Sequence, residues 1–211
     1  MSYLSVHEDA RTLARQLIES ADRTYLEDKH VVRSMEFYNA IKNLMQRHDC
    51  NAFTIECFEF CSSRLPEEWD ITPCVIHTLF KDQNIASACE AGLGALLSMR
   101  LLMFIAKKSS YLGNRFLREP NMLVINHSAP GIKMNGFDKP GLPYQLGRFV
   151  NSGWGTKSVV RVMNNAEKRV TAVRINPSAT KVLLLKGRLI GSSGWGPGQA
   201  GLLSRSARKA G

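Results

Sequence analysis

The spacing of apolar residues predicts two helices at the start of the chain. Between residues 27 and 47, apolar side chains recur every three or four positions, which places them on one face of a helix. These residues are Val31, Met35, Tyr38, Ile41 and Met45. A shorter apolar stripe precedes them, and Ser5 and Glu8 stand before it with the spacing of a capping box. We therefore expect the first helix to begin near Ser5.

Short strands and further helices alternate up to residue 105. Residues 51–57 alternate between apolar and polar side chains and residues 85–89 form a short run, so both segments are predicted strands. Residues 72–80 open with Thr-Pro, which favours a helix start. Residues 93–105 are apolar nearly all round, so this helix is expected to be buried between layers. Helices and strands in alternation favour a parallel sheet.

After residue 105 the pattern becomes that of antiparallel β structure. Apolar runs of strand length, separated by turn signals such as Asn-Gly, stand at 122–126, 159–163, 170–175 and 182–185. We predict an α/β fold followed by a β-rich domain: a partial parallel-sheet α/β domain over residues 1–105 and an antiparallel β C-terminal domain over 106–196. Residues 197–211, rich in Gly, Ser and Arg, are predicted to be a disordered basic tail.

The charge distribution supports a change of structure near the middle of the chain. The 211 residues carry a formal charge of +10. Residues 1–105 contain 10 Lys+Arg and 15 Asp+Glu, whereas residues 106–211 contain 18 and 3. The cations of the second half are scattered, and no helix-turn-helix pattern accompanies them. A basic surface that receives an acidic neighbour is therefore favoured over nucleic-acid binding.

The sequence disfavours membrane insertion and export. The longest strongly apolar stretch, residues 93–105, is interrupted by Arg100 and falls short of the ~20 residues of a membrane span. No basic-then-apolar signal region stands at the start. We therefore expect a cytoplasmic protein whose five cysteines are reduced thiols.

Two acidic residues and one histidine are candidates for chemistry because each follows a predicted strand. Glu56 and Glu90 end the two strands of the first region, and ligands of α/β sheets gather beyond such ends. The alternatives for these acids are a solvated loop position or a helix N-cap. His127 ends the apolar run 123–125, where imidazole could bind a metal or transfer a proton. Its alternative is a hydrogen-bonded turn histidine.

The spacing of cysteines raises the question of a zinc site. Cys57-x3-Cys61 and Cys74-x2-His77 together offer the four sulfur and nitrogen ligands of a zinc tetrahedron. Neither pair has the glycine-containing turn of a zinc knuckle, and Cys57 continues a predicted strand. Buried free cysteines are the favoured interpretation.

Several segments, taken in order, resemble the L-fucose isomerase and arabinose isomerase superfamily over roughly residues 27–195. They are Cys50–Phe58, Thr72–Cys74, Ala88–Leu97, Asn121–His127, Arg169–Arg174 and Leu183–Gly191. The resemblance implies two α/β domains followed by a β-rich C-terminal domain. It also implies interconversion of aldoses and ketoses, in which acidic residues move a proton through an enediol. A divalent metal, typically Mn²⁺, holds the sugar oxygens in that family.

The resemblance assigns roles to the three candidates and shows one departure. Glu56 corresponds to the first carboxylate, both catalytic and metal-binding; Glu90 is a second catalytic candidate, and His127 a metal or sugar contact. The family has aspartate as a metal ligand where this chain has Gly92. The resemblance further implies that the chain starts inside the second domain and lacks a late histidine segment. We therefore expect weak or no isomerase activity.

Two further functions remain open from the sequence. Members of the family are oligomeric, and a half-domain needs a partner to cover its sheet. A homo-oligomer or a complex with a partner domain is therefore expected, and a non-catalytic oligomerisation or binding module is the alternative function. A basic nucleic-acid-binding protein comes third.

Overall fold

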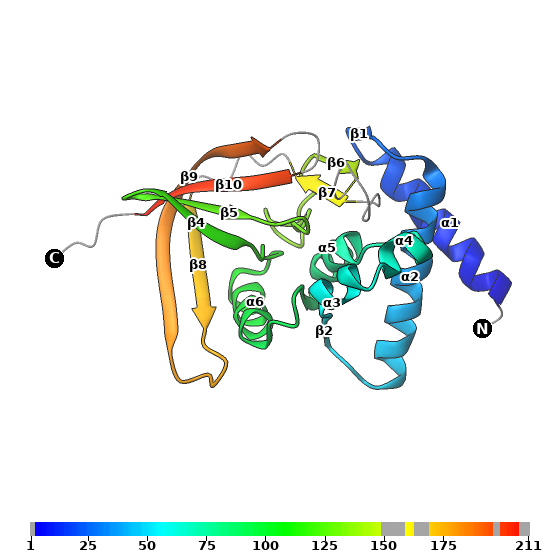
Figure 1. Cartoon of the computed structure of the whole chain (residues 1–211), viewed down its shortest axis with the longest axis horizontal. Coiled ribbons are helices and arrows are strands. Elements are labelled where there is room, and N and C mark those ends of the chain that lie inside the picture. The colour runs from blue at the N-terminus through cyan, green and yellow to red at the C-terminus, as the bar shows by residue number, and fades with distance from the viewer. Residues whose placement is uncertain (1–2, 149–158, 163–168, 196–198, 207–211) are drawn as a thin grey trace.

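The computed structural model describes residues 3–148, 159–162, 169–195 and 199–206, and shows a mixed α/β fold with small sheets (Figure 1). The helices are α1 (Tyr3–Glu19), α2 (Asp28–Arg47), α3 (Cys57–Ser62), α4 (Leu65–Trp69), α5 (Cys74–Asp82) and α6 (Leu93–Ala106). Among the described residues, none of these helices combines the length and apolar composition needed to cross a bilayer.

In the described part of the chain, three sheets accompany the helices. The first pairs β2 (Ala52–Thr54) with β3 (Ala86–Ala88) in parallel. The second has the order β1 (Arg23–Thr24), β6 (Tyr144–Gly147) and β7 (Val159–Val162), with β1 parallel to β6. The third is antiparallel and has the order β4 (Asn114–Glu119), β5 (Met122–Asn126), β10 (Gln199–Ser206), β9 (Val182–Trp195) and β8 (Arg169–Ile175).

The periodicity of the sequence predicted most of these elements, but not all of them and not all of their bounds. The helix expected over 27–47 is confirmed as α2, with Glu27 as its N-cap. The capping box at Ser5 is wrong, because α1 already begins at Tyr3. Cys57 does not continue a strand. It begins α3, because the chain turns directly after β2.

The disordered tail predicted from residue 197 is also wrong where the structure describes it. Residues 199–206 form β10, which lies inside the five-stranded sheet and pairs with β5 on one side and β9 on the other. Two neighbouring strands supply its backbone hydrogen bonds, so this strand forms without the apolar alternation from which strands are predicted. Residues 197, 198 and 207–211 lie outside the described residues.

The main core crosses residue 105. Buried side chains of α1, α2 and α5 pack against side chains from the segment 132–146. The Tyr144 hydroxyl, buried in this core, donates a hydrogen bond to the carbonyl oxygen of Leu17 on α1 at 2.6 Å. The structure thus supports the mixed α/β class, and does not confirm a separation into two domains at residues 105 and 106.

The helix α6 is buried on one face only. Ser98 and Gly94 face β8, where the Ser98 hydroxyl accepts a hydrogen bond from the Ile175 N–H at 2.8 Å. A Cβ added at Gly94 would lie 2.5 Å from the Ile175 carbonyl oxygen, so only glycine permits this close approach. The opposite face is exposed, and we call it the α6 outer face: Leu93, Leu97, Leu101, Phe104 and Ile105. The prediction of a fully buried helix is therefore wrong for half of its surface.

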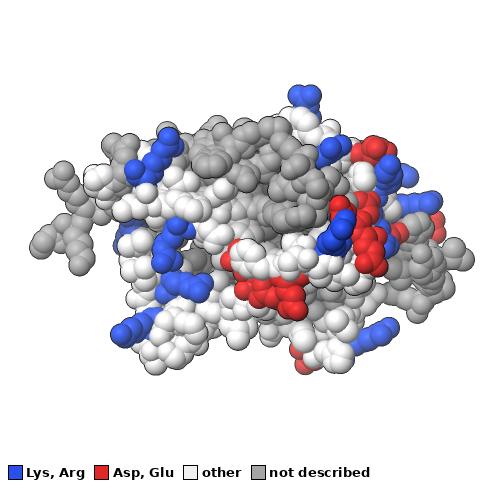
Figure 2. Space-filling view, in the orientation of Figure 1, with Lys and Arg blue, Asp and Glu red and all other residues white. Residues whose placement is uncertain are grey.

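The charge asymmetry of the sequence is visible on the surface. On the face drawn in Figure 2, acidic side chains gather over the helices, whereas the charged side chains over the five-stranded sheet are Lys and Arg. In the sequence of the sheet, Lys and Arg are spread along β4, β8 and β9 rather than concentrated at one point; they include Arg115, Arg169, Arg174, Lys186 and Arg188.

A stripe of polar side chains on α5 holds the loop 128–133, which follows β5. The Thr78 hydroxyl donates to the Pro130 carbonyl oxygen at 2.7 Å, and the Lys81 ammonium donates to the Ala129 carbonyl oxygen. The Asp82 carboxylate accepts from the N–H groups of Ile132 at 3.1 Å and Lys133 at 2.9 Å. All three side chains are largely buried. We call Thr78, Lys81 and Asp82 the α5 anchor.

The anchor predicts a large stability cost for Asp82→Ala. The substitution leaves two backbone N–H groups without an acceptor in a site from which water is largely excluded, and each such group costs about 1–3 kcal/mol. We expect the free energy of unfolding, measured in urea, to fall by about 3 kcal/mol. Asp138→Ala, which alters an exposed carboxylate, should change it by less than about 0.5 kcal/mol. Equal effects of the two substitutions would contradict the anchor.

Candidate functional site

The carboxyl ends of β2 and β3 bring two candidate acids and two cysteines to one edge. Because the strands are parallel neighbours, Glu56-Cys57 and Cys89-Glu90 leave the sheet side by side. A disulfide joins Cys57 to Cys89, whose Cα atoms lie 6.1 Å apart, an ordinary separation for bridged cysteines. The N–H of Ala91 also donates to the Ile55 carbonyl oxygen at 3.0 Å, which fastens the two turns together.

The disulfide corrects the expectation of five reduced thiols. The sequence did not reveal the pairing, because the two cysteines are 32 residues apart and meet only through the alignment of β2 with β3. The other three cysteines are free: Cys50 is exposed, Cys61 half-buried and Cys74 buried. Burial raises the pKa of the Cys61 thiol to about 11 and also raises the pKa of Cys74, so both remain protonated at neutral pH. The buried free cysteine that the sequence favoured is confirmed at Cys74.

The turn after β3 has an unusual backbone. Glu90 and Ala91 are both left-handed, with φ of 65° and 48°. Non-glycine residues in this region cost of order 1–3 kcal/mol each, and such conformations cluster at functional sites. The turn directs the Glu90 side chain toward β4 and the end of β5, where it meets Asn114 and His127.

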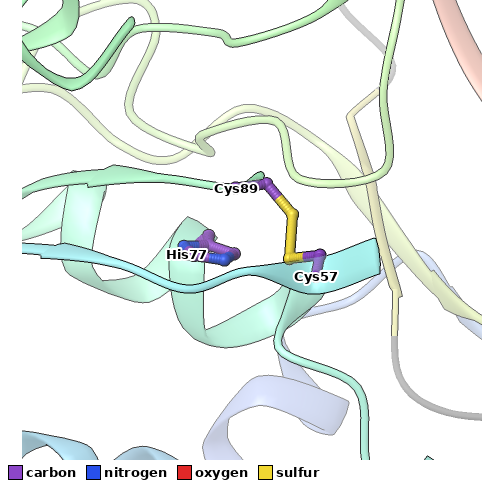
Figure 3. Close-up of side chains that lie close together, drawn as sticks. All are labelled: Cys57, His77 and Cys89. Atoms are coloured by element: carbon purple, nitrogen blue, oxygen red, sulfur yellow. A yellow bond between two sulfur atoms is a disulfide. The ribbon is translucent and has the colours of Figure 1, made fainter. Parts of the chain in front are cut away.

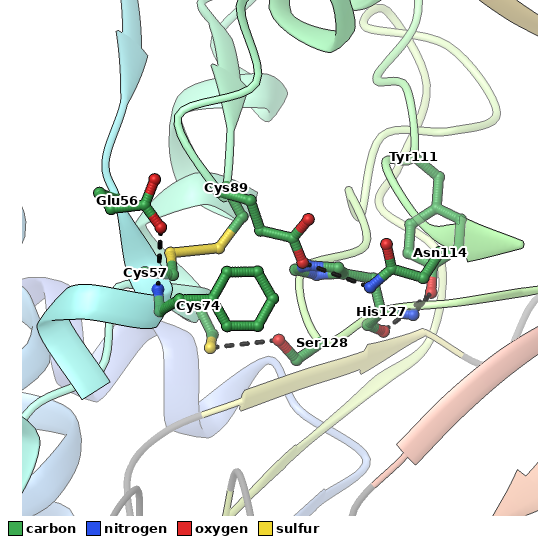
Figure 4. A network of polar contacts seen from close by, with 10 residues as sticks. Glu56, Cys57, Cys74, Cys89, Tyr111, Asn114, His127 and Ser128 are labelled. Atoms are coloured by element: carbon green, nitrogen blue, oxygen red, sulfur yellow. Dashed lines mark hydrogen bonds and ion pairs between the residues drawn. A yellow bond between two sulfur atoms is a disulfide. The ribbon is translucent and has the colours of Figure 1, made fainter. Parts of the chain in front are cut away.

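Glu90 and His127 form the pair at the centre of the candidate site. Glu90 Oε1 lies 3.5 Å from His127 Nε2, and Asn114 Nδ2 donates to the same oxygen at 3.3 Å (Figure 4). The contact with His127 lowers the pKa of the Glu90 carboxyl most, and the Asn114 hydrogen bond lowers it further, whereas partial burial opposes both. Glu90 is therefore held as a carboxylate beside an imidazole.

Tyr111 fixes the backbone of His127. Its hydroxyl accepts from the His127 N–H at 2.6 Å and donates to the His127 carbonyl oxygen at 2.8 Å. Burial raises the pKa of Tyr111, so its hydroxyl keeps the proton that it donates. The His127 side chain is only 9% exposed, and its Nδ1 has no hydrogen-bond partner among the described residues. The loop held by the α5 anchor follows directly.

Glu56 takes a different position from the other two candidates. Its carboxylate is the N-cap of α3, where Oε1 accepts from the Phe58 N–H at 3.3 Å. In Figure 4, Glu56 and His127 lie at opposite ends of the network, with the Cys57–Cys89 disulfide between them in this view. The structure thus brings Glu90 and His127 together and leaves Glu56 as a helix cap.

The arrangement does not fit the manganese site that the resemblance implies. Mn²⁺ prefers several oxygen ligands. Gly92 offers none, although a Cβ there would have room, with the Ala95 Cβ 3.5 Å away. In the described part of the chain, the group of three or more side chains that could hold a metal is Cys57, His77 and Cys89. The ligand atoms of that group are two sulfurs and one nitrogen, not the oxygens that Mn²⁺ prefers.

Sequence reasoning missed the residues that support the pair. Tyr111 and Asn114 stand in a loop and at the start of a strand, and nothing in their spacing marks them as neighbours of Glu90. No protein-family model matches the chain, and no curated protein matches it significantly. The resemblance to sugar isomerases therefore stays a prediction.

The pair predicts that His127→Gln will raise the pKa of the Glu90 carboxyl toward its usual value of 4.5, because the largest cause of the lowered pKa is removed. Asn114→Ala should raise the pKa of Glu90 by a smaller amount. Titration followed by ¹³C NMR of the carboxyl carbon measures the pKa of Glu90 in both variants. His30→Gln is the matched control, since His30 faces Asp70 at 2.7 Å instead.

Because the pKa of Glu90 is lowered in the folded protein, its charge makes the free energy of unfolding depend on pH. The stabilising contribution of Glu90 is present above pH 4.5 and is lost as the pH falls through the lower, folded-state pKa. This acid-dependent loss should shrink in His127→Gln. An unchanged Glu90 titration in that variant would contradict the pairing.

Proposed function

We propose that this chain is a relative of the metal-dependent aldose–ketose isomerases of the L-fucose and arabinose isomerase superfamily, with little or no activity as it stands. In this proposal it comprises the end of an α/β domain and a β-rich C-terminal domain. The observation that carries it is the contact of 3.5 Å between Glu90 and His127 beyond the carboxyl end of β3. The resemblance of the sequence to that family supports the same assignment.

The pair suits the proton transfers of an isomerisation. Glu90, as a carboxylate, accepts the proton from the sugar carbon next to the carbonyl, and the carbonyl oxygen gains a proton to give an enediol. Returning the carbon-bound proton to the neighbouring carbon, with loss of a hydroxyl proton, completes the change from aldose to ketose. His127 is placed to exchange the oxygen-bound proton. The reaction is redox-neutral, so it needs no oxidant or reductant.

Two features explain why we expect the rate to be low. Negative charge develops on the sugar oxygen during enediol formation, and a bound metal supplies several kcal/mol of stabilisation in enzymes that hold one. This chain has Gly92 at the position of one expected ligand, and its Glu56 carboxylate is occupied as a helix cap. Neither residue stabilises charge beside Glu90 and His127.

The proposal predicts slow deuterium incorporation into L-fucose or L-arabinose in D₂O. We expect rates well below the ~10 s⁻¹ of a typical enzyme, and a further drop of at least tenfold in Glu90→Gln. Proton NMR of the sugar measures the exchange at carbon 2. His30→Gln serves as the control. Conversion at ordinary enzyme rates would contradict the predicted weakness, and unchanged exchange in Glu90→Gln would contradict the role of Glu90.

A second candidate function, a non-catalytic assembly module, is favoured by exposed apolar surface. The α6 outer face is an apolar stripe bordered by the exposed Arg100, and residues Val182–Leu185 of β9 are exposed as well. Contiguous apolar patches of this kind mark interaction sites more often than isolated exposed residues do. In this reading, the α6 outer face packs against a second copy of the chain.

The assembly module predicts a molar mass above that of the 23.6 kDa chain in light scattering. Leu97→Glu combined with Leu101→Glu should lower the mass to that of the monomer, because two charges enter the apolar stripe. Leu44→Glu places a charge on an exposed leucine of α2 and should leave the assembly intact. A monomeric wild-type chain at micromolar concentration would contradict this candidate.

A further inference from the structure

His77 is a buried histidine that the catalytic proposal does not use. It lies on α5 and is 1% exposed. Its Nδ1 lies 2.7 Å from the Ser87 hydroxyl of β3, and the Phe53 ring stacks on it at 5.4 Å between centroids. Its Nε2 is buried without a hydrogen-bond partner among the described residues. An unsatisfied polar atom of this kind costs about 1–3 kcal/mol, so its retention needs a reason.

The disulfide lies against this histidine. Figure 3 shows the His77 ring beside the Cys57–Cys89 bridge. The two sulfur atoms and a ring nitrogen of His77 all lie within 4.8 Å of one another. In a zinc tetrahedron, with Zn–S bonds of about 2.3 Å and Zn–N bonds of about 2.0 Å, ligand atoms are roughly 3.5–3.8 Å apart. Small movements of the three side chains would therefore enclose a zinc ion.

We propose that Cys57, His77 and Cys89 form a zinc site when the disulfide is reduced, so that the chain exchanges a covalent cross-link for a bound metal. A set of two thiolates and one imidazole binds Zn²⁺ more favourably than it binds Mn²⁺. Ser87 acts as the outer partner that holds the ring, because a hydrogen bond from Nδ1–H to its hydroxyl leaves the lone pair on Nε2. Three protein ligands leave a fourth position for water.

The electrostatic setting supports neutral imidazole as a ligand. Burial lowers the pKa of His77 well below its usual value, and the nearby Lys81 lowers it further. The ring is therefore uncharged at neutral pH, and one of its two nitrogens carries a free lone pair. Cys57 is half-buried, whereas His77 and Cys89 are buried, so a reductant and the ion reach the group from the Cys57 side.

The exchange balances when a dithiol reductant takes part. Two electrons and two protons pass from the dithiol to the Cys57–Cys89 bond, which breaks to give two thiols, while the dithiol closes to a disulfide. Zn²⁺ then binds the two sulfurs as thiolates and releases two protons to water. In the reverse direction a small-molecule disulfide is the oxidant: it takes two electrons from the two thiolates and two protons from water to become a dithiol, the Cys57–Cys89 bond re-forms and the zinc ion is released. The site is independent of the isomerase proposal, because its readout is metal binding.

The test uses the full chain, oxidised or reduced with a phosphine, and Zn²⁺ as the probe. We expect the reduced chain to bind one zinc ion with a dissociation constant below about 1 μM, and the oxidised chain to bind at least a hundredfold more weakly. Cys89→Ser and His77→Gln should each weaken zinc binding by at least tenfold. Cys50→Ser and Cys61→Ser, which alter free thiols outside the group, should not change it.

A second measurement needs no variant and guards against misfolding. Zinc should protect Cys57 and Cys89 of the reduced chain from alkylation, as located by mass spectrometry, while exposed Cys50 reacts at the same rate with and without zinc. Co²⁺ in place of zinc should give thiolate charge-transfer bands in the reduced chain only. Equal zinc affinity of the oxidised and reduced chains, or protection of Cys61 and Cys74 instead, would overturn the proposal.

Discussion

The hydrogen bonds from side chains of α5 to the backbone of the loop 128–133 are the interaction on which the rest of this structure depends. Thr78, Lys81 and Asp82 each hold backbone groups of that loop from a single turn of helix. The opposite side of α5 packs into the main core with Phe80 and Ile76. One helix therefore fixes both the apolar core and the polar loop. A substitution that shifts α5 on one side also disturbs the contacts on its other side. Burying charged groups is costly, so the contacts are stable only as a complete set.

The candidate site is a consequence of that arrangement. Glu90 comes from a left-handed turn after β3, whereas His127 stands at the end of β5, directly before the anchored loop. The two side chains meet because α5 and Tyr111 hold the His127 backbone in place. The disulfide and the Glu90–His127 pair thus lie beyond the carboxyl end of the small parallel sheet, and the loop held by the α5 anchor begins directly after His127.

Sequence periodicity predicted the elements whose own side chains determine them. The apolar stripe of α2 and the apolar run of β5 are local signals, and both elements appear where they were expected. The strand β10 was missed because its own sequence lacks apolar alternation, and only its place between β5 and β9 makes it a strand. The exposure of half of α6 was missed for a similar reason. An apolar face looks the same in a sequence whether or not another element covers it.

The same limit applied to the site. Position after a strand indicated Glu90 and His127, but the pairing of Cys57 with Cys89, and the approach of His77, require the alignment of β2, β3 and α5. These contacts join residues 12 to 32 positions apart. Glu56 was singled out by the same rule as Glu90, yet its carboxylate is used by the helix that follows it. A strand-end acid beside a helix start can serve either purpose, and only tertiary contacts decide.

The core that crosses residue 105 has a consequence for how the chain folds during synthesis. Residues 132–146 complete the cover over the apolar faces of α1, α2 and α5, and among the described strands β1 pairs with β6. At about 5–20 residues per second, the ribosome leaves these faces uncovered for several seconds after α5 has been made. Nascent chains of this protein therefore expose this apolar surface to solvent until the segment 132–146 covers it.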